Sequence, residues 1–537
     1  MLGKSKWPLS IWDFETLRRG GYHYIDKTEL VWQLANTLDM AFLSRPRRFG
    51  KSMLTTTLKC YFEGKQELFE GLRLAELEAQ KGEGAWQKHP VLRFDMSESG
   101  HSSLQDLEEL LNDQLRYWEN TYGVCFEGGA QSRLRQLIQH LACSRGTGVV
   151  ILIDEYDNPL THTIEPHKAE LHAQYKEVLR GFYSVLKGEM DKLRFVLLTG
   201  ITQFQHLSLF SGLNNLFDIS LTDEYNAICG VTHEELHSTF GEEIEALAKR
   251  HGVGRGEMDA RLKELYDGFR FSPGGEEIYN PFSIIRALGT GRLKNYWFNS
   301  GLPYVVQTLM PGYWYDFRKL DRGVSAGEEE LIRFYPDNSN PVPILFQTGY
   351  LTVKGYDPIM DTFELGFPNE EVKYDFWKGL IPLVLGVAKD TQSIFHVRDF
   401  VGAINGGDID GFLAQLKALV ASIPYSSLDV KNRPPKEERY QVAIYLIFQL
   451  AGRYVRAEVH SAKGRSDIEV ITPDAIYIFE TKVHSEEHPN TAEGAIAQIL
   501  GMEYAAPYLA SEKRVVAIGL VYDGEETVDM GWKELKA

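Results

Sequence analysis

The chain has 537 residues, 43% hydrophobic and 25% charged, an ordinary globular composition with room for about two to four domains. Its 57 basic and 75 acidic residues leave a net charge of -18, which repels nucleic acid on average and argues against a protein that binds DNA over its whole surface. None of the four cysteines forms a CxxC pair, so neither a zinc ribbon nor a disulfide framework is indicated, and we expect buried free thiols at Cys60, Cys125, Cys143 and Cys229.

The N-terminal segment MLGKSKWPLSIWDF has no apolar signal core, and no later stretch approaches the ~18 apolar residues of a membrane span. The longest apolar runs, such as residues 149–153, are the length of a strand. These features predict a soluble cytoplasmic protein with no membrane partner.

Residues 1–230 alternate short apolar runs with longer amphipathic ones, which predicts an α/β domain with a mainly parallel sheet. The predicted strands are Met40–Ser44, Val91–Asp95, Val149–Asp154 and residues 195–199, and the clearest helices are residues 104–119 and 170–186.

Residues 231–430 form a predicted middle region that is mainly helical. Its pattern is helical over residues 234–289, mixed with short strand-like pieces over 294–369, and helical again over 370–419. The polar segment KNRPPKEER, residues 431–439, holds two prolines and is typical of a connection between domains.

Residues 431–537 predict a last α/β domain. A helix over residues 440–450 is followed by three β-like runs, then by another helix and a final strand. The predicted ranges are 454–460, 467–471 and 475–482 for the runs, 492–509 for the helix and 515–522 for the strand.

A phosphate-binding motif follows the first strand. The sequence SRPRRFGKSMLTTTL resembles the Walker A pattern that ends in Gly-Lys-Ser and opens a helix. In such a loop Gly50 lets backbone N–H groups approach phosphate, Lys51 reaches the β- and γ-phosphates, and Ser52 ligates Mg²⁺. The predicted ATP-binding residues here are Arg45, Pro46, Arg47, Arg48, Phe49, Gly50, Lys51 and Ser52.

This loop departs from the common pattern because Arg45 stands at the first glycine position and Pro46 follows it. The arginines Arg45, Arg47 and Arg48 add charge that attracts phosphate, or else contact another subunit. The motif taken alone also allows a plain strand, turn and helix.

The run VVILIDEYD matches the Walker B arrangement, an apolar strand that ends in two acids. Asp154 would hold Mg²⁺ directly or through water, and Glu155 would orient or deprotonate the attacking water. Thr199 ends a further strand, where it could sense the γ-phosphate or be an ordinary strand-end residue. A buried strand with two solvated acids is the alternative to the Walker B interpretation, and no arginine finger is identifiable.

A nuclease-like set lies near the C-terminus, in RSDIEVITPDAIYIFETK. Residues two apart on a strand share a face, so Glu480 and Lys482 project together, and a hairpin turning at residues 472–474 brings Asp467 beside them. Asp467 and Glu480 would bind Mg²⁺ or Mn²⁺, and Lys482 would position water or stabilise the transition state. Glu458 is a possible further acid, Gln498 could contact substrate or water, and a salt-bridged sheet end is the alternative.

Together these segments resemble a bacterial and archaeal family, AAA-ATPase-like proteins with a C-terminal PD-(D/E)xK nuclease-superfamily domain. The motifs that carry the resemblance are YIDKTELV, FLSRPRRFGKS, VVILIDEYDNPL, LFSGLNNLFDISL, YNPFSI, FQTGYLT, GFPNEEV, GRSDIEV and IYIFETK. The resemblance implies that Arg45 is a family feature and that Asp467, Glu480 and Lys482 match the nuclease core. Two departures are Gln203, where a basic residue is often found, and Thr481, where a bulky apolar residue is usual and little harm is expected.

The sequence therefore predicts an ATP-regulated, Mg²⁺- or Mn²⁺-dependent nuclease that binds DNA or RNA at a local site and could form a homo-oligomer. In this hypothesis Glu155, Asp467, Glu480 and Lys482 are catalytic. The alternative is a nucleotide-switched signalling or scaffold protein with a silent nuclease fold, which the charge of -18 favours.

Overall fold

The structure is a computed structural model that describes residues 6–97, 100, 102–164, 166–203, 215–297, 315–332, 340–385, 403–404, 406–421, 436–450, 454–457, 466–523 and 527–536. The chain divides into two compact units: unit 1 comprises Met1–Ser300 and Gly323–Val372, and unit 2 comprises Gly301–Arg322 and Lys373–Ala537. The chain thus passes between the units three times. The division into residues 1–230, 231–430 and 431–537 stays a prediction.

Unit 1 contains the predicted parallel sheet. Its strand order is β2-β3-β4-β1-β5, and each neighbouring pair is parallel. The apolar runs define the strands well, because all of the first and third strands are buried. The strands are β1 Met40–Ser44, β2 Val91–Asp95, β3 Val149–Asp154, β4 Leu193–Gly200 and β5 Phe217–Asp218.

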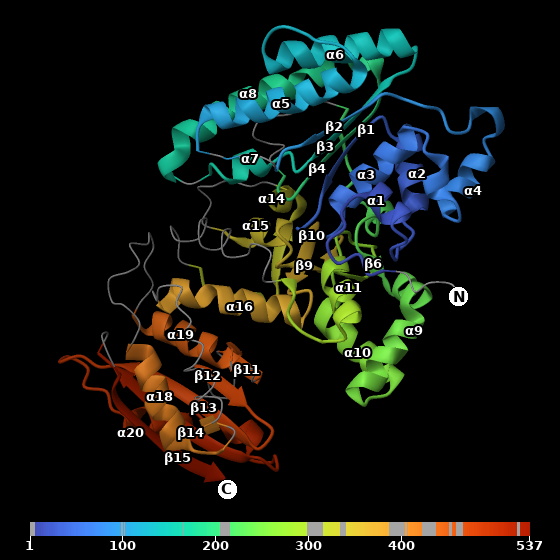
Figure 1. Cartoon of the computed structure of the whole chain (residues 1–537). Helices are drawn as coiled ribbons and strands as arrows, with labels where there is room; N and C mark the ends of the chain where they lie inside the picture. The colour runs from blue at the N-terminus through green and yellow to red at the C-terminus, as the bar shows by residue number, and fades with distance from the viewer. Residues whose placement is uncertain are drawn as a thin grey trace. The chain divides into compact units, whose positions relative to one another are not determined.

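Helices lie on both sides of this sheet. Figure 1 shows α5, α6 and α8 together on one side and α1 to α4 on the other. Local signals set the helix ends: Ser103 and Asp106 form a capping box at the start of α5, and Gly123 ends it with φ of 72°. The helices are α1 Phe14–Arg19, α2 Thr28–Thr37, α3 Lys51–Phe62, α4 Arg73–Ala79, α5 Leu104–Tyr122, α6 Ala130–Arg145, α7 Asn158–Thr161 and α8 Ala169–Gly188.

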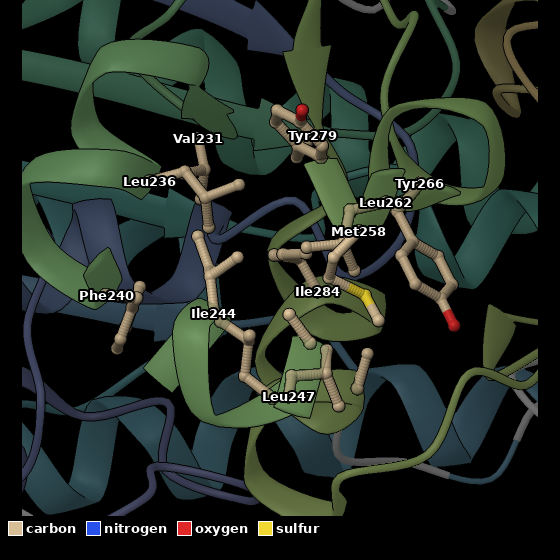
Figure 2. Packing of buried hydrophobic residues seen from close by; sticks show 13 residues of the cluster. Val231, Leu236, Phe240, Ile244, Leu247, Met258, Leu262, Tyr266, Tyr279 and Ile284 are labelled. Carbon is tan, nitrogen blue, oxygen red and sulfur yellow. The ribbon is translucent and has the colours of Figure 1, made fainter. Parts of the chain in front are cut away.

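A helical lobe with its own core follows. Figure 2 shows apolar side chains of α9, α10 and α11 packed together, with Val231 and Phe240 at one end of the cluster. A capping box of Thr232 and Glu235 starts α9, and Gly252 ends it. The elements are β6 Val231–Thr232, α9 His233–His251, α10 Arg255–Tyr266, β7 Ile278–Tyr279 and α11 Pro281–Thr290.

The remainder of unit 1 contains a three-stranded antiparallel sheet in the order β8-β10-β9. It accounts for the strand-like pieces expected in residues 294–369. The elements here are β8 Val324–Gly327, α14 Glu328–Ile332, α15 Val342–Gln347, β9 Thr352–Asp357 and β10 Thr362–Gly366.

Unit 2 is built on a mixed sheet in the order β11-β12-β13-β14-β15, where only the β13–β14 pair is parallel. This confirms the C-terminal α/β domain. The strands are β11 Tyr454–Ala457, β12 Ile468–Ile471, β13 Ala475–Val483, β14 Arg514–Tyr522 and β15 Thr527–Lys536. The helices are α13 Arg318–Asp321, α16 Glu370–Leu385 (which begins at the end of unit 1), α18 Ile409–Ala421, α19 Lys436–Leu450 and α20 Ala492–Gly501.

Three details of unit 2 differ from the sequence expectation. Helix α19, Lys436–Leu450, includes residues 436–439 of the segment expected to be a connection, because Lys and Glu are good helix formers. Helix α20 ends at Gly501 rather than 509, and Glu503 follows it with φ of 54°, outside the helical region. The last strand, β15, was not anticipated.

Two further expectations concern the whole chain. All four cysteines are free, but only Cys60 and Cys229 are buried; the prediction was wrong for Cys125 and Cys143, which are exposed. Within the described residues, no helix combines the length and apolar character needed to cross a membrane.

Candidate functional site

The loop between β1 and α3 has a backbone suited to phosphate. Arg48 and Gly50 adopt positive φ of 67° and 98°, so the glycine supplies a conformation that side chains disfavour just before the helix starts. The side chain of Lys51 folds back over the loop, and its Nζ donates to the carbonyls of Arg45 at 3.0 Å and Pro46 at 3.2 Å. The lysine is thereby held at the helix N-terminus.

A cavity of about 540 Å³ opens beside this loop. Gly50, Lys51 and Ser52 line it together with Glu155, which follows β3, so the structure brings together residues about 100 positions apart. Its other walls are largely apolar. They include Tyr24, Ile25, Val31, Ile228, Val231, Phe240, Pro281, Phe282 and Ile285.

Two arginines face the same cavity from different elements. The guanidinium carbons of Arg48 and Arg286 lie 3.7 and 4.4 Å from the ring centroid of Phe282. Burial lowers the pKa of Arg48, and the positive charges of Arg286 and Arg47 lower it further. Lys27, which pairs with Glu235, and His23 also line the cavity. Glu155 is the single acid among the described residues of this lining, so Arg48, Lys51 and Arg286 give the site the charge to hold an anion.

Three of the predicted loop residues, Arg45, Pro46 and Arg47, lie outside this cavity lining. Arg45 is 1% exposed, and its guanidinium donates to the carbonyls of Ser44, Ser220, Tyr225 and Asn226. Burial lowers its pKa to about 10, so it stays charged at neutral pH. Arg45 therefore stabilises the start of the loop through its bonds to backbone carbonyls, and a direct contact with phosphate stays a prediction.

Pro46, Arg47 and Phe49 complete the loop. Phe49 is buried, with its ring centroid 4.8 Å from that of Phe269 and 5.4 Å from that of Phe271, and it also lines the cavity. Pro46 is buried against Gly349, where an added Cβ would lie 2.6 Å from its Cγ. Arg47 is half-buried. The segment FQTGYLT thus packs directly on the loop.

The acid at the end of β3 is fully buried and already engaged. Asp154 Oδ1 accepts from the Thr199 hydroxyl at 2.7 Å, and Oδ2 accepts from Arg93 at 2.8 Å. Arg93 also donates to Thr55 of α3 at 3.2 Å. Sequence reasoning missed Arg93, although an arginine in the apolar run VLRFD was a usable signal.

The residues after Asp154 form a tight, strained turn. Glu155 adopts φ of 50°, and its Oε2 accepts from Asn158 at 3.1 Å. Asp157 accepts backbone N–H groups of Ile201 at 3.1 Å and Thr202 at 2.7 Å, which fastens this turn to the end of β4. Backbone strain of this kind gathers at functional sites.

Gln203 stands where the family often has a basic residue. Its Nε2 donates to the Ser44 hydroxyl at 3.1 Å, and its backbone N–H donates to Gln347 Oε1 at 3.0 Å. Gln203 therefore links the first strand to α15. Its observed contacts are structural, and its neutral amide carries no charge with which to sense phosphate.

In unit 2, the hairpin of β12 and β13 carries the predicted nuclease set. Ile468 pairs with Phe479, so Asp467 and Glu480 stand opposite one another at the same end of the hairpin. Asp467 Oδ2 accepts from the backbone N–H of Thr481 at 2.7 Å and from its hydroxyl at 2.5 Å. Thr472 closes the turn, bonding Ala475 through both backbone and hydroxyl.

Glu480 is 3% exposed, and its Oε1 accepts from Lys482 at 2.8 Å and from Gln498 of α20. Glu469, which sequence reasoning missed, is buried and accepts from Ser466 at 2.7 Å and from Tyr508. Glu458 lies outside the described residues. In the described part of the chain, no three His, Cys, Asp or Glu residues gather as a metal-binding group.

Comparisons with known proteins match two separate parts of the chain. Residues 8–210 match the family described as predicted AAA-ATPase, and residues 435–532 match the PD-(D/E)XK nuclease superfamily. An uncharacterized protein encoded in the vnfD 5′ region of Azotobacter chroococcum mcd 1 is 31% identical over 542 residues, covering 99% of each chain. The chain belongs to the family of AAA-ATPase-like proteins that carry a C-terminal PD-(D/E)XK nuclease-superfamily domain.

Proposed function

We propose that the protein binds and hydrolyses ATP in the cavity of unit 1 and that nucleotide controls a metal-dependent nuclease in unit 2. The observation that supports the ATP half most strongly is the convergence of Gly50, Lys51, Ser52 and Glu155 on one cation-lined cavity. Its volume of about 540 Å³ suits a nucleotide-sized ligand.

The cavity residues suit distinct tasks. Backbone N–H groups at the start of α3 would bind the phosphates of ATP, as would the Lys51 ammonium once it exchanges its loop carbonyls for phosphate oxygens. The apolar wall would cover the adenine base. Ser52 and Asp154 offer oxygen donors for Mg²⁺, which when bound would neutralise phosphate charge. Asp154 Oδ2 accepts hydrogen bonds from Arg93 and Thr55, whereas Oδ1 accepts one from Thr199 and retains a second lone pair for a metal-bound water.

Glu155→Gln is expected to keep ATP binding but to slow hydrolysis by a factor of ~10²–10⁴, the usual worth of a general base. The amide keeps the shape of the side chain and loses the ability to take a proton from water. Nucleotide affinity by calorimetry and phosphate release should be measured on the same preparation. Normal turnover would remove Glu155 from this role.

Arg286→Ala is expected to weaken ATP binding about 10-fold, because one charge-assisted hydrogen bond contributes roughly 1.5–3 kcal/mol. Arg286 makes no hydrogen bond or ion pair with the described residues, and a bound triphosphate would relieve its repulsion with Arg48. Arg292→Ala, which removes an exposed cation outside the cavity, is the control. Equal ATP affinity in Arg286→Ala and Arg292→Ala would contradict this assignment.

For unit 2 we propose hydrolysis of DNA or RNA. Asp467 and Glu480 are carboxylate ligands of the type that Mg²⁺ and Mn²⁺ prefer, and a bound ion would polarise the phosphodiester and acidify its water. Lys482, which contacts Glu480, would hold that water or the developing charge. Cleavage of single- and double-stranded DNA and RNA, with Mg²⁺ or Mn²⁺ and with or without ATP, tests this proposal.

A nucleotide-switched scaffold is the second candidate. The net charge of -18 favours it. Absence of cleavage under every metal, nucleotide and substrate condition, with intact ATP turnover, would give this candidate the lead.

A further inference from the structure

Asp467 stands at the end of a buried chain of hydrogen bonds within unit 2. Arg318 Nη1 donates to Gln441 Oε1 at 3.1 Å, and Gln441 Nε2 donates to the Thr481 hydroxyl at 3.1 Å. That hydroxyl donates in turn to Asp467 Oδ2 at 2.5 Å. The three supporting side chains are 4%, 8% and 0% exposed, so water hardly competes for these bonds.

The direction of this chain is fixed by its first member. A guanidinium only donates, so Gln441 must present its carbonyl oxygen to Arg318 and its NH₂ to Thr481. The Thr481 hydroxyl then accepts from Gln441, and its single proton is left for the carboxylate. Were the amide turned round, its oxygen would draw that proton away from Asp467.

The bond from the Thr481 hydroxyl also determines which oxygen of Asp467 is left to bind a metal ion. Oδ2 of Asp467 accepts both the backbone N–H and the hydroxyl of Thr481, whereas Oδ1 accepts no hydrogen bond from the described residues. Oδ1 is thus the oxygen left to accept a ligand.

We infer that Thr481 is a positioning residue for metal binding: its hydroxyl, oriented by Gln441 and Arg318, locks Asp467 so that Oδ1 alone meets the cation. This rests on the proposed nuclease function of unit 2. Outer partners that orient a ligand commonly contribute 10- to 100-fold to metal affinity, so their loss should be measurable without any cleavage assay.

The experiment compares Thr481→Val with Thr481→Ser in the full chain. Valine keeps the shape and removes the hydroxyl, and serine keeps the hydroxyl. Mn²⁺ binding without nucleotide is measured by electron paramagnetic resonance, with Asp467→Ala as the baseline for ions bound elsewhere. We expect the unit 2 affinity to fall about 10-fold in Thr481→Val and by less than about 3-fold in Thr481→Ser.

Gln441→Glu separates orientation from packing. The carboxylate keeps the volume and gains an ion pair with Arg318, but it only accepts and takes the hydroxyl proton for itself. Mn²⁺ affinity should therefore fall as in Thr481→Val while the melting temperature stays near that of wild type.

Each outcome is decisive. Wild-type affinity in Thr481→Val, or equal losses in the valine and serine variants, would overturn the positioning role and leave the nuclease proposal standing. If wild type binds Mn²⁺ no better than Asp467→Ala and cleaves nothing, the nuclease proposal fails and the positioning role fails with it.

Discussion

Lys51→Ala is expected to reduce ATP hydrolysis below detection and to weaken nucleotide binding. Lys51 is the only lysine in the phosphate loop, and its Nζ is held by two loop carbonyls at the start of α3. The arginines that line the same cavity, Arg48 and Arg286, stack on Phe282, so they do not occupy the position of this ammonium. Phosphate release and ATP affinity on purified full-length protein measure both effects.

Lys59→Ala is the matched control for this change. Lys59 belongs to the same helix, α3, but it pairs with Glu63 at 2.8 Å and lies outside the cavity lining. The control should keep wild-type turnover. If Lys51→Ala turns over ATP at the rate of Lys59→Ala, the phosphate-loop assignment is wrong.

Asp467→Ala and Lys482→Ala are expected to eliminate nucleic-acid cleavage while ATP hydrolysis stays near wild type. Removing Asp467 takes away a metal ligand, and removing Lys482 leaves Glu480 without its cation. Both changes lie in unit 2, whereas the phosphate loop lies in unit 1. ATPase and cleavage rates should be measured on the same preparations.

The sheet of unit 2 offers a matched control for each of these two variants. Asp474→Ala removes an exposed acid from its turn, and Lys533→Ala removes an exposed lysine from β15. Both should cleave like wild type. A wild type that cleaves together with an Asp467→Ala variant that cleaves equally well would refute the metal assignment.

These variants should also differ in stability from what the sequence alone suggests. Two nearby carboxylates predict that Asp467→Ala relieves repulsion and stabilises the fold slightly. The structure reverses this sign, because the buried Thr481 N–H and hydroxyl lose their acceptor, at a cost of roughly 1–3 kcal/mol. Lys482→Ala should also destabilise, since Glu480 is buried beside it.

The strands β1, β2 and β3 were predictable because each is a short, mainly apolar run. The bounds of β1, β2 and β3 agree residue for residue with those expected from the sequence. The strand β15, TVDMGWKELK, mixes charged and apolar residues without regular alternation, and it is held by pairing with β14 along the sheet edge. No local pattern predicts such a strand.

The site was predictable only where a contiguous motif encodes it. Lys51 and Ser52 follow from the loop, but three of the four carbonyl partners of Arg45 lie 175 to 181 residues away. Likewise, Arg286 reaches the cavity from a helical lobe with a separate core. The departure at Thr481 was expected to do little harm. The sequence could not show its bond to Asp467, because that bond depends on how the end of the hairpin closes.

Because the chain passes between the units three times, parts of unit 2 are synthesised before unit 1 is complete. Arg318 leaves the ribosome 123 residues before its partner Gln441, an interval of roughly 6–25 s at ~5–20 residues per second. Unit 1 is complete in sequence once Val372 has emerged, so it can fold before most of unit 2 has been synthesised. The nuclease-like unit is therefore the last to become complete, after a wait in which Arg318 has no Gln441 to bind.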